Sequence, residues 1–428
     1  MNCRIHRGAN EIGGSCVELS TESTRIFIDA GLPLNGRSCS LPSDIDSVDA
    51  VLISHPHLDH YGLIDQIPRN MPIYMGGLGQ RLIKASRMFR GLPLFDNRFV
   101  SIEHHRPISI GNFEIIPYLM DHSAPDAYAF LVKGQGKTIF YSGDFRAHGR
   151  KARLYDQLLS NPPSGVDILI LEGTMMNRSN HTYQDETSVE DGMQDAMRKE
   201  PGPCFLVCSS QNIDRIVSAY RACVKEKRIF VVDIYTAWLL HELSCFSSHI
   251  PTINWSNVRV LSKGWPASRH YNIVKNSPEY FNGFVHELYR PGNVITIDDL
   301  KRDPKQYCIK SSYVYDLIKE MACMHATVIY SMWEGYMHQE HNPQGFEQYQ
   351  KLQNDKNIQF VTIHTSGHAP INDLKRFADA LQPKSIIPIH TEHKELYKDY
   401  FDNVCMLDDG KVLDLSETLV VPDEQILI

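Results

Sequence analysis

The chain has 428 residues, enough for two or three domains or for one large domain with an insertion. Its composition is 42% hydrophobic, and no apolar run approaches the roughly 18 residues of a membrane helix, which argues against a membrane protein. The formal net charge of −8 argues against a protein that coats nucleic acid without specificity, but it permits a nuclease with a local basic groove.

Two features predict a cytoplasmic location. The N-terminal residues 1–7 lack the apolar core of a signal peptide. The ten cysteines are scattered and form no Cys-x-x-Cys pair, so reduced thiols are the simplest explanation.

The first predicted element is a β-hairpin over residues 16–31, with its turn at residues 21–24. Asp29 stands at the end of its second, apolar strand, just before Gly31. A carboxylate in this place suits hydrogen bonds that orient neighbouring loops. An ordinary aspartate at a strand end explains it equally well.

A histidine-rich segment follows residues 51–54, a hydrophobic run that predicts a buried strand. The segment carries His55, His57, Asp59 and His60, and these are the ligand types that suit zinc at a hydrolytic site. The two alternating histidines can converge on one metal, and the next pair, one turn on, can face a second. The alternative is a polar surface loop in which histidines cluster by chance.

Residues 79–90 have a helical pattern in which four basic residues recur at three-residue spacing: Arg81, Lys84, Arg87 and Arg90. This spacing predicts a basic helix face. Such a face is more often simply solvated.

Three more chemically active residues stand at the ends of apolar strand patterns. They are His122, Asp144 and Glu172. Ligands that arrive at successive strand ends predict a site along one edge of a sheet. Taken alone, His122 suits an ordinary loop and Asp144 an ordinary turn, but the preceding histidine-rich segment favours metal ligands.

From about residue 189 helix and strand patterns alternate, which predicts a small α/β unit with a parallel sheet. Residues 209–215 join a strand to the start of a helix. The side chains of Ser209, Ser210 and Asn212, with the free helix N–H groups, suit a phosphate cradle. A plain helix N-cap is an equally good interpretation. Residues 235–325 carry no motif that points to chemistry.

Histidines return at strand ends near the C-terminus. His364 and His368 follow a strand pattern at residues 358–363, and His390 follows another at residues 385–389. Nothing among the other side chains suggests a serine or cysteine nucleophile with a positioned base. A site with two metals is the chemistry that these residues favour.

The ordered set of motifs resembles the metallo-β-lactamase fold and, within it, the β-CASP branch of nucleic-acid-processing enzymes. The chain is most similar to ribonuclease J, and the matching segments are residues 11–13, 28–31, 55–60, 122–128, 142–145, 210–215, 364–368 and 388–390. Only 38 residues follow His390, so the C-terminal domain that is usual in ribonuclease J is expected to be lacking.

The resemblance implies an αββα metallo-β-lactamase sandwich with an inserted β-CASP α/β domain. The expected first part of the sandwich is residues 1–172, the insert is residues 173–350, and the second part is residues 351–428.

The resemblance also implies a cofactor of two Zn²⁺ ions, with Mn²⁺ as an alternative. One ion would be held by His55, His57 and His122. The other would be held by Asp59, His60 and His390, with Asp144 bridging the two.

Further roles follow from the same resemblance. Asp29 would orient the metal-binding loop. His368, near Glu172, would protonate or position the leaving 3′ oxygen, so that the expected catalytic residues are Asp59, Asp144, Glu172 and His368. The expected contacts with substrate phosphates come from His364, Thr365, Ser366, Gly367 and His368, and from Ser209, Ser210 and Asn212.

The implied function is a metal-dependent ribonuclease that hydrolyses phosphodiester bonds with a hydroxide held between two metals. It would act as a 5′-to-3′ exonuclease, with or without endonuclease activity, on single-stranded RNA. The resemblance does not carry over an oligomeric state, so a homodimer stays an open alternative. Protein partners are unknown, and no membrane is indicated.

Three alternatives come from other classes. A DNA nuclease of the same branch is the nearest, but its DNA-repair members lack a histidine at the position of His390. A small-molecule metallo-hydrolase would not need an insert of this size, and a non-catalytic scaffold subunit would have lost ligands.

Overall fold

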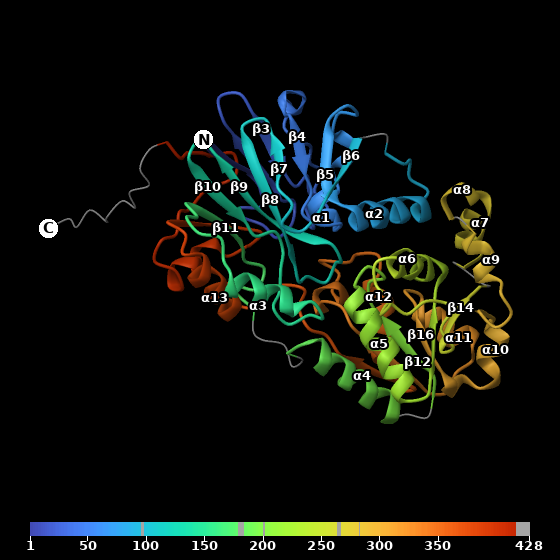
Figure 1. Ribbon diagram of the computed structural model, residues 1–428. Coiled ribbons are helices and arrows are strands. Elements are labelled where there is room, and N and C mark those ends of the chain that lie inside the picture. The colour runs from blue at the N-terminus through green and yellow to red at the C-terminus, as the bar shows by residue number, and fades with distance from the viewer. Residues whose placement is uncertain (96–97, 179–183, 200–201, 263–266, 282, 417–428) are drawn as a thin grey trace. The chain divides into compact units, whose positions relative to one another are not determined.

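The computed structural model describes residues 1–95, 98–178, 184–199, 202–262, 267–281 and 283–416. The chain forms two compact units (Figure 1). The first unit contains residues 1–80, 95–180 and 367–428, and the second contains residues 81–94 and 181–366. Among the described residues, no helix is long and apolar enough to cross a membrane.

The first unit contains two sheets. The first sheet has the strand order β20-β1-β2-β3-β4-β5-β6. Its strands are β1 (Asn2–Arg7), β2 (Cys16–Ser20), β3 (Arg25–Ile28), β4 (Ala50–Leu52), β5 (Pro72–Gly76), β6 (Arg98–Ile102) and β20 (Val412–Asp414). The antiparallel pairing of β2 with β3 confirms the hairpin predicted at residues 16–31, and β3 to β6 are parallel.

The second sheet has the strand order β19-β11-β10-β9-β8-β7. Its strands are β7 (Ile108–Ile110), β8 (Phe113–Met120), β9 (Ala127–Gly134), β10 (Lys137–Tyr141), β11 (Ile168–Glu172) and β19 (Ser385–Ile389). Strands β10, β11 and β19 run parallel, so their carboxyl ends meet at one edge of the sheet. Strand β19 comes from the C-terminal part of the chain, and it completes this edge.

The two sheets share a buried apolar core. Ile26 and Ile28 of β3 belong to the same core cluster as Phe130 and Val132 of β9 and Ile139 of β10. The alternate side chains of β9 and β10 point the other way, as expected for strands with a side-chain period of two.

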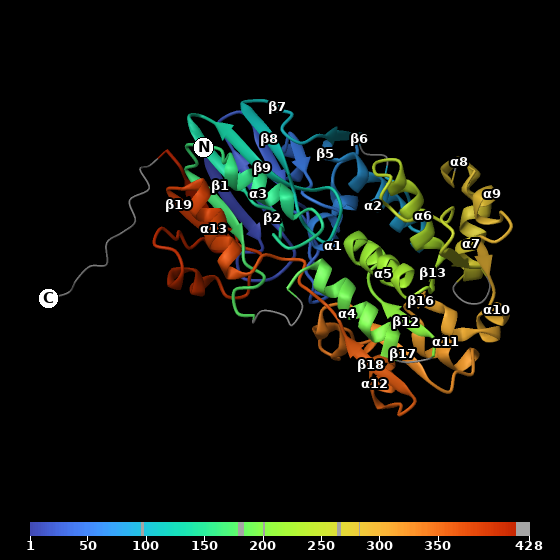
Figure 2. The ribbon, with the colours of Figure 1, turned by 60° about the horizontal axis from the view of Figure 1, so that its bottom comes forward.

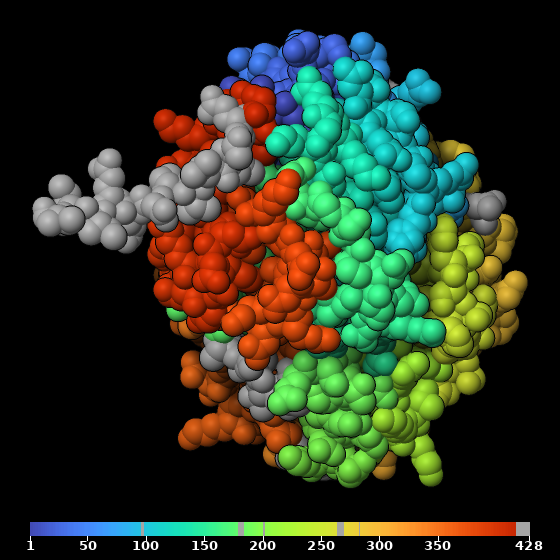
Figure 3. Space-filling view, turned by 60° about the vertical axis from the view of Figure 1, so that its left-hand side comes forward, coloured from blue at the N-terminus to red at the C-terminus, as the bar shows by residue number. Residues whose placement is uncertain are grey.

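Those alternate side chains meet two helices, α3 (Ala152–Ser160) and α13 (Ile371–Leu381). Leu131 and Phe140 of the sheet cluster with Tyr155 of α3 and Phe377 of α13. Figure 2 shows α13 beside α3, and the space-filling view shows the orange-red C-terminal residues packed against green residues of this part of the chain (Figure 3).

The second unit is built on one parallel sheet with the strand order β15-β14-β13-β16-β12-β17-β18. Its strands are β12 (Cys204–Val207), β13 (Ile229–Val232), β14 (Val258–Leu261), β15 (Val294–Ile295), β16 (Tyr307–Lys310), β17 (Ala326–Tyr330) and β18 (Ile358–Thr362). Its helices are α4 (Glu186–Lys199), α5 (Ile213–Lys225), α6 (Ile234–Ser244), α7 (Ala267–Asn276), α8 (Pro278–Phe281), α9 (Phe284–Leu288), α10 (Ile297–Arg302), α11 (Val314–Glu320) and α12 (Phe346–Asn354).

Both faces of this parallel sheet are covered. Cys204 and Leu206 of β12 belong to a core that contains residues of α4, α5 and α6. Phe205 and Val207 belong to another core, with residues of α10, α11 and α12. A strand buried on both faces reads as a continuous apolar run, which is why the sequence predicts this α/β unit.

The compact units differ from the predicted segments at both ends of the insert and in helix α2. The predicted insert begins at residue 173, whereas this part of the second unit begins at residue 181. The predicted boundary at 350/351 falls inside α12, whereas the second unit extends to Ser366 because β18 pairs with β17. Helix α2 (Gly77–Arg90) begins in the first unit, but its residues from Arg81 onward belong to the second. The reason is that Leu82, Ala85 and Phe89 join the apolar core of the second unit.

Candidate metal centre

The histidine-rich segment follows β4 and leads directly into the short helix α1 (Leu58–Tyr61). His57 has an extended backbone and stands at the N-cap of α1. Close packing holds the segment in place: a side chain at Gly31 would meet the carbonyl oxygen of Asp59 at 1.7 Å. Glycine is therefore required where the first hairpin passes under the metal-binding loop.

Three imidazoles form the first group of donors. His55 Nε2 lies 3.1 Å from His57 Nδ1, which lies 3.2 Å from His122 Nε2. Three ligands of a tetrahedral zinc with Zn–N bonds of about 2.0–2.1 Å are separated by about 3.3 Å, from simple geometry. The three nitrogens therefore have nearly the spacing of ligands that share one ion.

A second group combines Asp59, His60, Asp144 and His390, whose donor atoms all lie within 4.8 Å of one another. Asp144 Oδ2 is at the centre, 3.1 Å from His60 Nε2 and 3.7 Å from His390 Nε2. The same oxygen lies 3.7 Å from His55 Nε2 of the first group. This carboxylate therefore reaches both groups of donors.

Hydrogen bonds at the Nδ1 atoms of three imidazoles orient their Nε2 atoms toward the cluster. The Nδ1–H of His122 donates to the carbonyl of Gly367 (2.7 Å), and that of His60 donates to Asp29 (2.8 Å). The Nδ1 of His390 lies 2.8 Å from the hydroxyl of Thr174, which also contacts the His390 carbonyl at 3.4 Å. In each ring the proton on Nδ1 leaves the Nε2 lone pair facing the cluster, as metal-binding histidines require.

Asp29 is fully buried behind this centre. One of its oxygens accepts from the Ser54 N–H at 2.7 Å, and the other accepts from the hydroxyl of Tyr141 at 2.7 Å as well as from His60. Asp29 and His390 both have positive φ, at 65° and 54°. Such strain costs free energy and persists only where surrounding contacts hold it. The contacts with Ser54, Tyr141 and His60 hold the Asp29 carboxylate in place.

Burial and neighbouring charges set the protonation of the centre. Burial, together with the adjacent imidazoles, lowers the pKa of His55 and His122 well below the usual value and that of His57 to about 4. Burial acts to raise the pKa of Asp144, but His390 and His60 outweigh it and hold the pKa well below its usual range. Burial acts to lower the pKa of His60, but the carboxylates of Asp144 and Asp29 outweigh it and raise the pKa well above the usual value. Neutral imidazoles and ionised carboxylates are zinc ligands, so metal binding at the second group would release the proton of His60.

One buried imidazole nitrogen that forms no hydrogen bond also fits a metal site. His60 Nε2 is buried and forms no hydrogen bond with any of the described residues, although Asp144 Oδ2 lies 3.1 Å away. A buried polar atom without a hydrogen bond costs free energy. A divalent ion between these two atoms would satisfy both.

Glu172 and His368 lie beside the second group of donors. Glu172 Oε1 lies 3.3 Å from His368 Nδ1, and Oε2 accepts from the Thr174 N–H at 3.0 Å. Burial acts to lower the pKa of His368, but the carboxylates of Glu172 and Asp144 outweigh it and raise the pKa. Asp144, Glu172, His368 and His390 also form a third cluster of donors within 4.8 Å.

The predicted substrate residues are divided between the units. Gly367 and His368 lie at the metal centre, whereas His364, Thr365 and Ser366 belong to the second unit. There Arg215 lies 3.0 Å from His364 Nδ1 and donates to the Thr365 carbonyl at 3.2 Å.

The predicted phosphate cradle lies at the start of α5. Asn212 accepts from the Arg215 N–H at 3.1 Å, which is the N-cap interpretation. Ser210 is buried and hydrogen-bonds to Thr236 and Lys310, while Ser209 accepts from the Gln211 N–H. All three side chains thus form local hydrogen bonds, and the side chain of Ser209 is also exposed.

Sequence reasoning missed Thr174, Tyr141 and Arg215. Thr174 and Tyr141 are uncharged, and a hydroxyl near a strand end has no distinctive spacing. Arg215 was visible only as part of the 210–215 segment, without a reason to expect that it would be fully buried.

Comparisons with known proteins agree with this geometry. The family described as "Beta-lactamase superfamily domain" matches residues 24–197, and the "Zn-dependent metallo-hydrolase RNA specificity domain" matches residues 355–402. Ribonuclease J of Helicobacter pylori (strain B128) is 22% identical over 91% of the chain, but the match covers 55% of that protein. The chain thus spans about half the length of such relatives.

Two further relatives are matched over nearly their whole length. An RNase J-like protein of Methanocaldococcus jannaschii is 23% identical over 91% of this chain and 92% of its own. A solved structure of a protein of unknown function from Enterococcus faecalis V583 has a TM-score of 0.74 at 19% identity and covers 96% of this chain and 99% of its own. The expected α/β fold is thereby confirmed.

Proposed function

We propose that this chain, which contains a metallo-β-lactamase domain and an RNA specificity domain and is consistent with a β-CASP nuclease, is a metal-dependent ribonuclease. One observation carries the proposal: two buried groups of zinc-type donors meet at Asp144. The buried His/Asp cluster and the matched zinc-hydrolase domain support the use of metal.

The proposed centre holds two zinc ions, with manganese as the alternative. His55, His57 and His122 hold one ion, and Asp59, His60 and His390 hold the other, with Asp144 shared by both. When bound, such a pair supplies a nucleophile at neutral pH and positive charge that stabilises phosphate oxygens. Asp29, Thr174 and the carbonyl of Gly367 keep the imidazoles in the orientation that this requires.

His368 is the proposed proton donor. Its side chain is 20% exposed beside the fully buried Asp144, and Glu172 holds its Nδ1. The raised pKa of His368 keeps the imidazolium available, so that it can protonate the leaving 3′ oxygen of the cleaved bond. Glu172 orients the ring through its hydrogen bond and also accepts from backbone N–H groups.

The proposed substrate is single-stranded RNA. The name of the domain matched at residues 355–402 and the names of the relatives both support RNA. The segment 364–367 is proposed to contact substrate phosphates. Arg215 donates to the Thr365 carbonyl and so holds the backbone of this segment in place. The proposed mode of cleavage is 5′-to-3′ hydrolysis.

The test pairs a labelled RNA with single-stranded DNA of the same sequence, each with a 5′-monophosphate or a 5′-hydroxyl. Protein stripped of metal is reloaded with zinc or manganese and compared with His57→Ala combined with Asp59→Ala. Metal-dependent release of mononucleotides from RNA, absent in the variant, is the expected result. Equal hydrolysis by the variant, or no hydrolysis of RNA by the metal-loaded protein, would contradict the proposal.

A further inference from the structure

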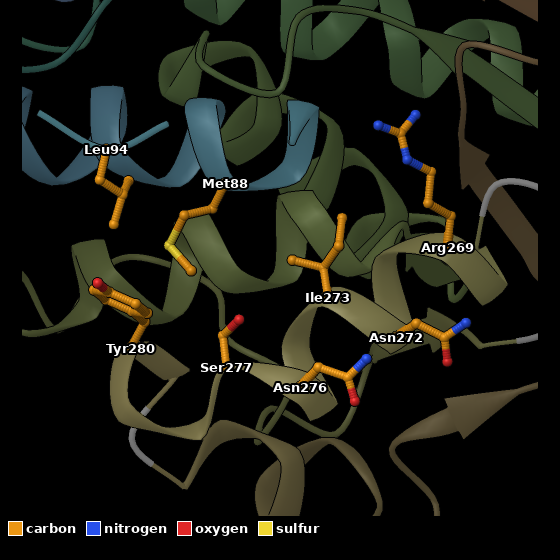
Figure 4. A pocket seen from close by; sticks show the side chains of 8 residues that line it. All are labelled: Met88, Leu94, Arg269, Asn272, Ile273, Asn276, Ser277 and Tyr280. Atoms are coloured by element: carbon orange, nitrogen blue, oxygen red, sulfur yellow. The ribbon is translucent and has the colours of Figure 1, made fainter. Parts of the chain in front are cut away.

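A pocket of about 570 Å³ opens on the surface of the second unit (Figure 4). It lies between residues 81–94, which include the end of α2, and helices α7 and α8. Met88, Leu94 and Ile273 give it an apolar floor, and Asn272, Asn276 and Ser277 add amide and hydroxyl groups. Its volume falls within the roughly 300–1,000 Å³ of small-ligand sites, and an apolar surface with a few polar groups is typical of them.

The walls of the pocket are held together without a ligand. Phe89 of α2 packs edge-on against His270 of α7, at 5.0 Å between ring centroids, and against Phe281 of α8, at 5.6 Å. Arg269 donates to the carbonyl of Arg90, the last residue of α2, at 3.3 Å. A basic side chain is favourable at the C-terminal end of a helix.

Tyr280 gives the pocket an exposed aromatic ring. Tyr280 is 38% exposed, and the ammonium group of Lys84 lies over one face of its ring, 4.4 Å from the centroid. An exposed ring with a cation over one face suits a nucleotide, since a base can stack on an aromatic ring and the adjacent phosphate meets the positive charge.

The charge around the pocket is opposite to that of the whole chain. Lys84, Arg90, Arg269 and Lys275 are exposed cations on α2 and α7. The nearby acids include Glu279, which precedes Tyr280 on α8 and is exposed. This local excess of cations occurs in a chain with a formal net charge of −8, and it complements a phosphate backbone.

The four basic positions of α2 are used in different ways. Arg87 is buried, and its Nε–H donates to the Pro93 carbonyl at 2.6 Å. Arg81 pairs with Glu242 at 3.4 Å and lies 5.3 Å from the ring of the exposed Phe246. The basic face predicted from the sequence therefore reaches the surface at Arg81, Lys84 and Arg90, and it continues onto α7 through Arg269.

We propose that this pocket is an accessory RNA-binding site that takes one unstacked nucleotide of a single-stranded RNA. The base lies against Tyr280 and the apolar floor, with Asn272 and Asn276 at its polar edge. The flanking phosphates meet Lys84 and Arg269. The inference deepens the proposed function and rests on it for the identity of the ligand, because an aromatic ring among cations is not by itself specific for RNA over an acidic peptide.

The test measures RNA binding without cleavage. Fluorescence anisotropy of a labelled oligouridine is recorded with the full chain in EDTA, so that no metal is available for hydrolysis. Lys84→Ala combined with Tyr280→Ala is expected to weaken binding about 5- to 100-fold, which is the usual range for loss of one stacked base. Arg269→Ala is expected to weaken it less and to reduce the dependence of binding on salt.

The chain offers a matched control. Lys319 lies over the ring of Tyr315 at the same distance of 4.4 Å, on α11 of the same unit. Lys319→Ala combined with Tyr315→Ala removes an equivalent cation–aromatic pair away from the pocket and is expected to leave RNA affinity unchanged. Thermal melting of all variants checks that the fold is retained.

The outcomes separate the two proposals. Equal RNA affinity in the wild type and the Lys84/Tyr280 variant would overturn the pocket assignment, as would binding of an acidic peptide but not of RNA. A second arm measures RNA hydrolysis by the metal-loaded wild type. Failure of that arm alone contradicts the proposed function, while a selective loss of RNA binding in the pocket variant still supports the pocket.

Discussion

The two units each bury a cluster of polar and charged groups, but the clusters are satisfied in opposite ways. In the first unit, imidazole nitrogens of His55, His57 and His122 face one another at 3.1–3.2 Å. In the second unit, fully buried Arg215 directs its N–H groups at Glu186, Ser331 and Thr365. The converging imidazole nitrogens of the first unit suit an ion between them, whereas the N–H groups of Arg215 meet acceptors and need no ion.

Removing a proposed metal ligand should have the largest effect on the activity of the first unit. His390→Ala takes one donor from the group around Asp144, and we expect it to lower the metal content by one ion per chain. Hydrolysis of RNA should fall on the order of 1,000-fold, because a bound metal contributes several kcal/mol to stabilising the transition state. Metal analysis of the purified variant, alongside its turnover rate, provides the measurement. Full activity with an unchanged metal content would exclude His390 as a ligand.

Arg215→Ala tests the other side of the comparison. It removes the guanidinium that pairs with the buried carboxylate of Glu186, so the free energy of unfolding should fall by about 3–5 kcal/mol. Urea denaturation with and without EDTA measures this loss, which should not depend on metal. Lys351→Ala, which removes an exposed ion pair with Glu347, serves as control and should cost less than about 1 kcal/mol. An effect of Arg215→Ala as small as that of the control would contradict the account.

His368→Gln separates proton transfer from metal binding. The variant should keep its metals but lose on the order of 100-fold in rate, since general acid catalysis is removed. In the wild type the protonated imidazole is the active form, and Glu172 holds its pKa above the usual value. Activity should therefore fall as the pH rises through that raised pKa, and the variant should lack this limb of the profile. A variant that has lost its metals would instead identify His368 as a ligand.

Thr174→Val is expected to have the smallest effect of the four changes. Valine keeps the shape of the side chain but removes the hydroxyl that lies 2.8 Å from His390 Nδ1. The loss of an orienting partner behind a ligand is expected to weaken metal binding about 10-fold or more. Titration with a zinc-buffered chelator compares the variant with Thr391→Ser, a control next to His390 that keeps the hydroxyl accepting from the His393 N–H. Equal affinities in the wild type and Thr174→Val would show that the hydroxyl does not orient the ring.

Much of the clustering of donors at the candidate metal centre was predictable because these residues follow a rule of position. His55 to His60 are nearly contiguous, and His122, Asp144 and His390 each follow an apolar run. Because β10, β11 and β19 are parallel, residues at their carboxyl ends reach one edge of the sheet. The spacing of donors that results is a tertiary property, but the pattern of strand ends predicts it.

The extent of the second unit and the contacts within it were less predictable. The apolar stripe of α2 indicates that the helix packs on a core, but it does not say which core. Leu82 and Phe89 belong to that of the second unit. Likewise, the 209–212 segment has the composition of both a helix cap and a phosphate cradle. Only the contacts of Ser210 and Asn212 show that their side chains form local hydrogen bonds.

The most direct test of the central claim is anomalous X-ray diffraction at the zinc edge from crystals of the zinc-loaded protein. The account predicts two peaks within the first unit, one bonded to His55, His57 and His122 and the other to Asp59, His60 and His390, with Asp144 between them. A peak held instead by Glu172 and His368, or no peak among these side chains, would contradict it.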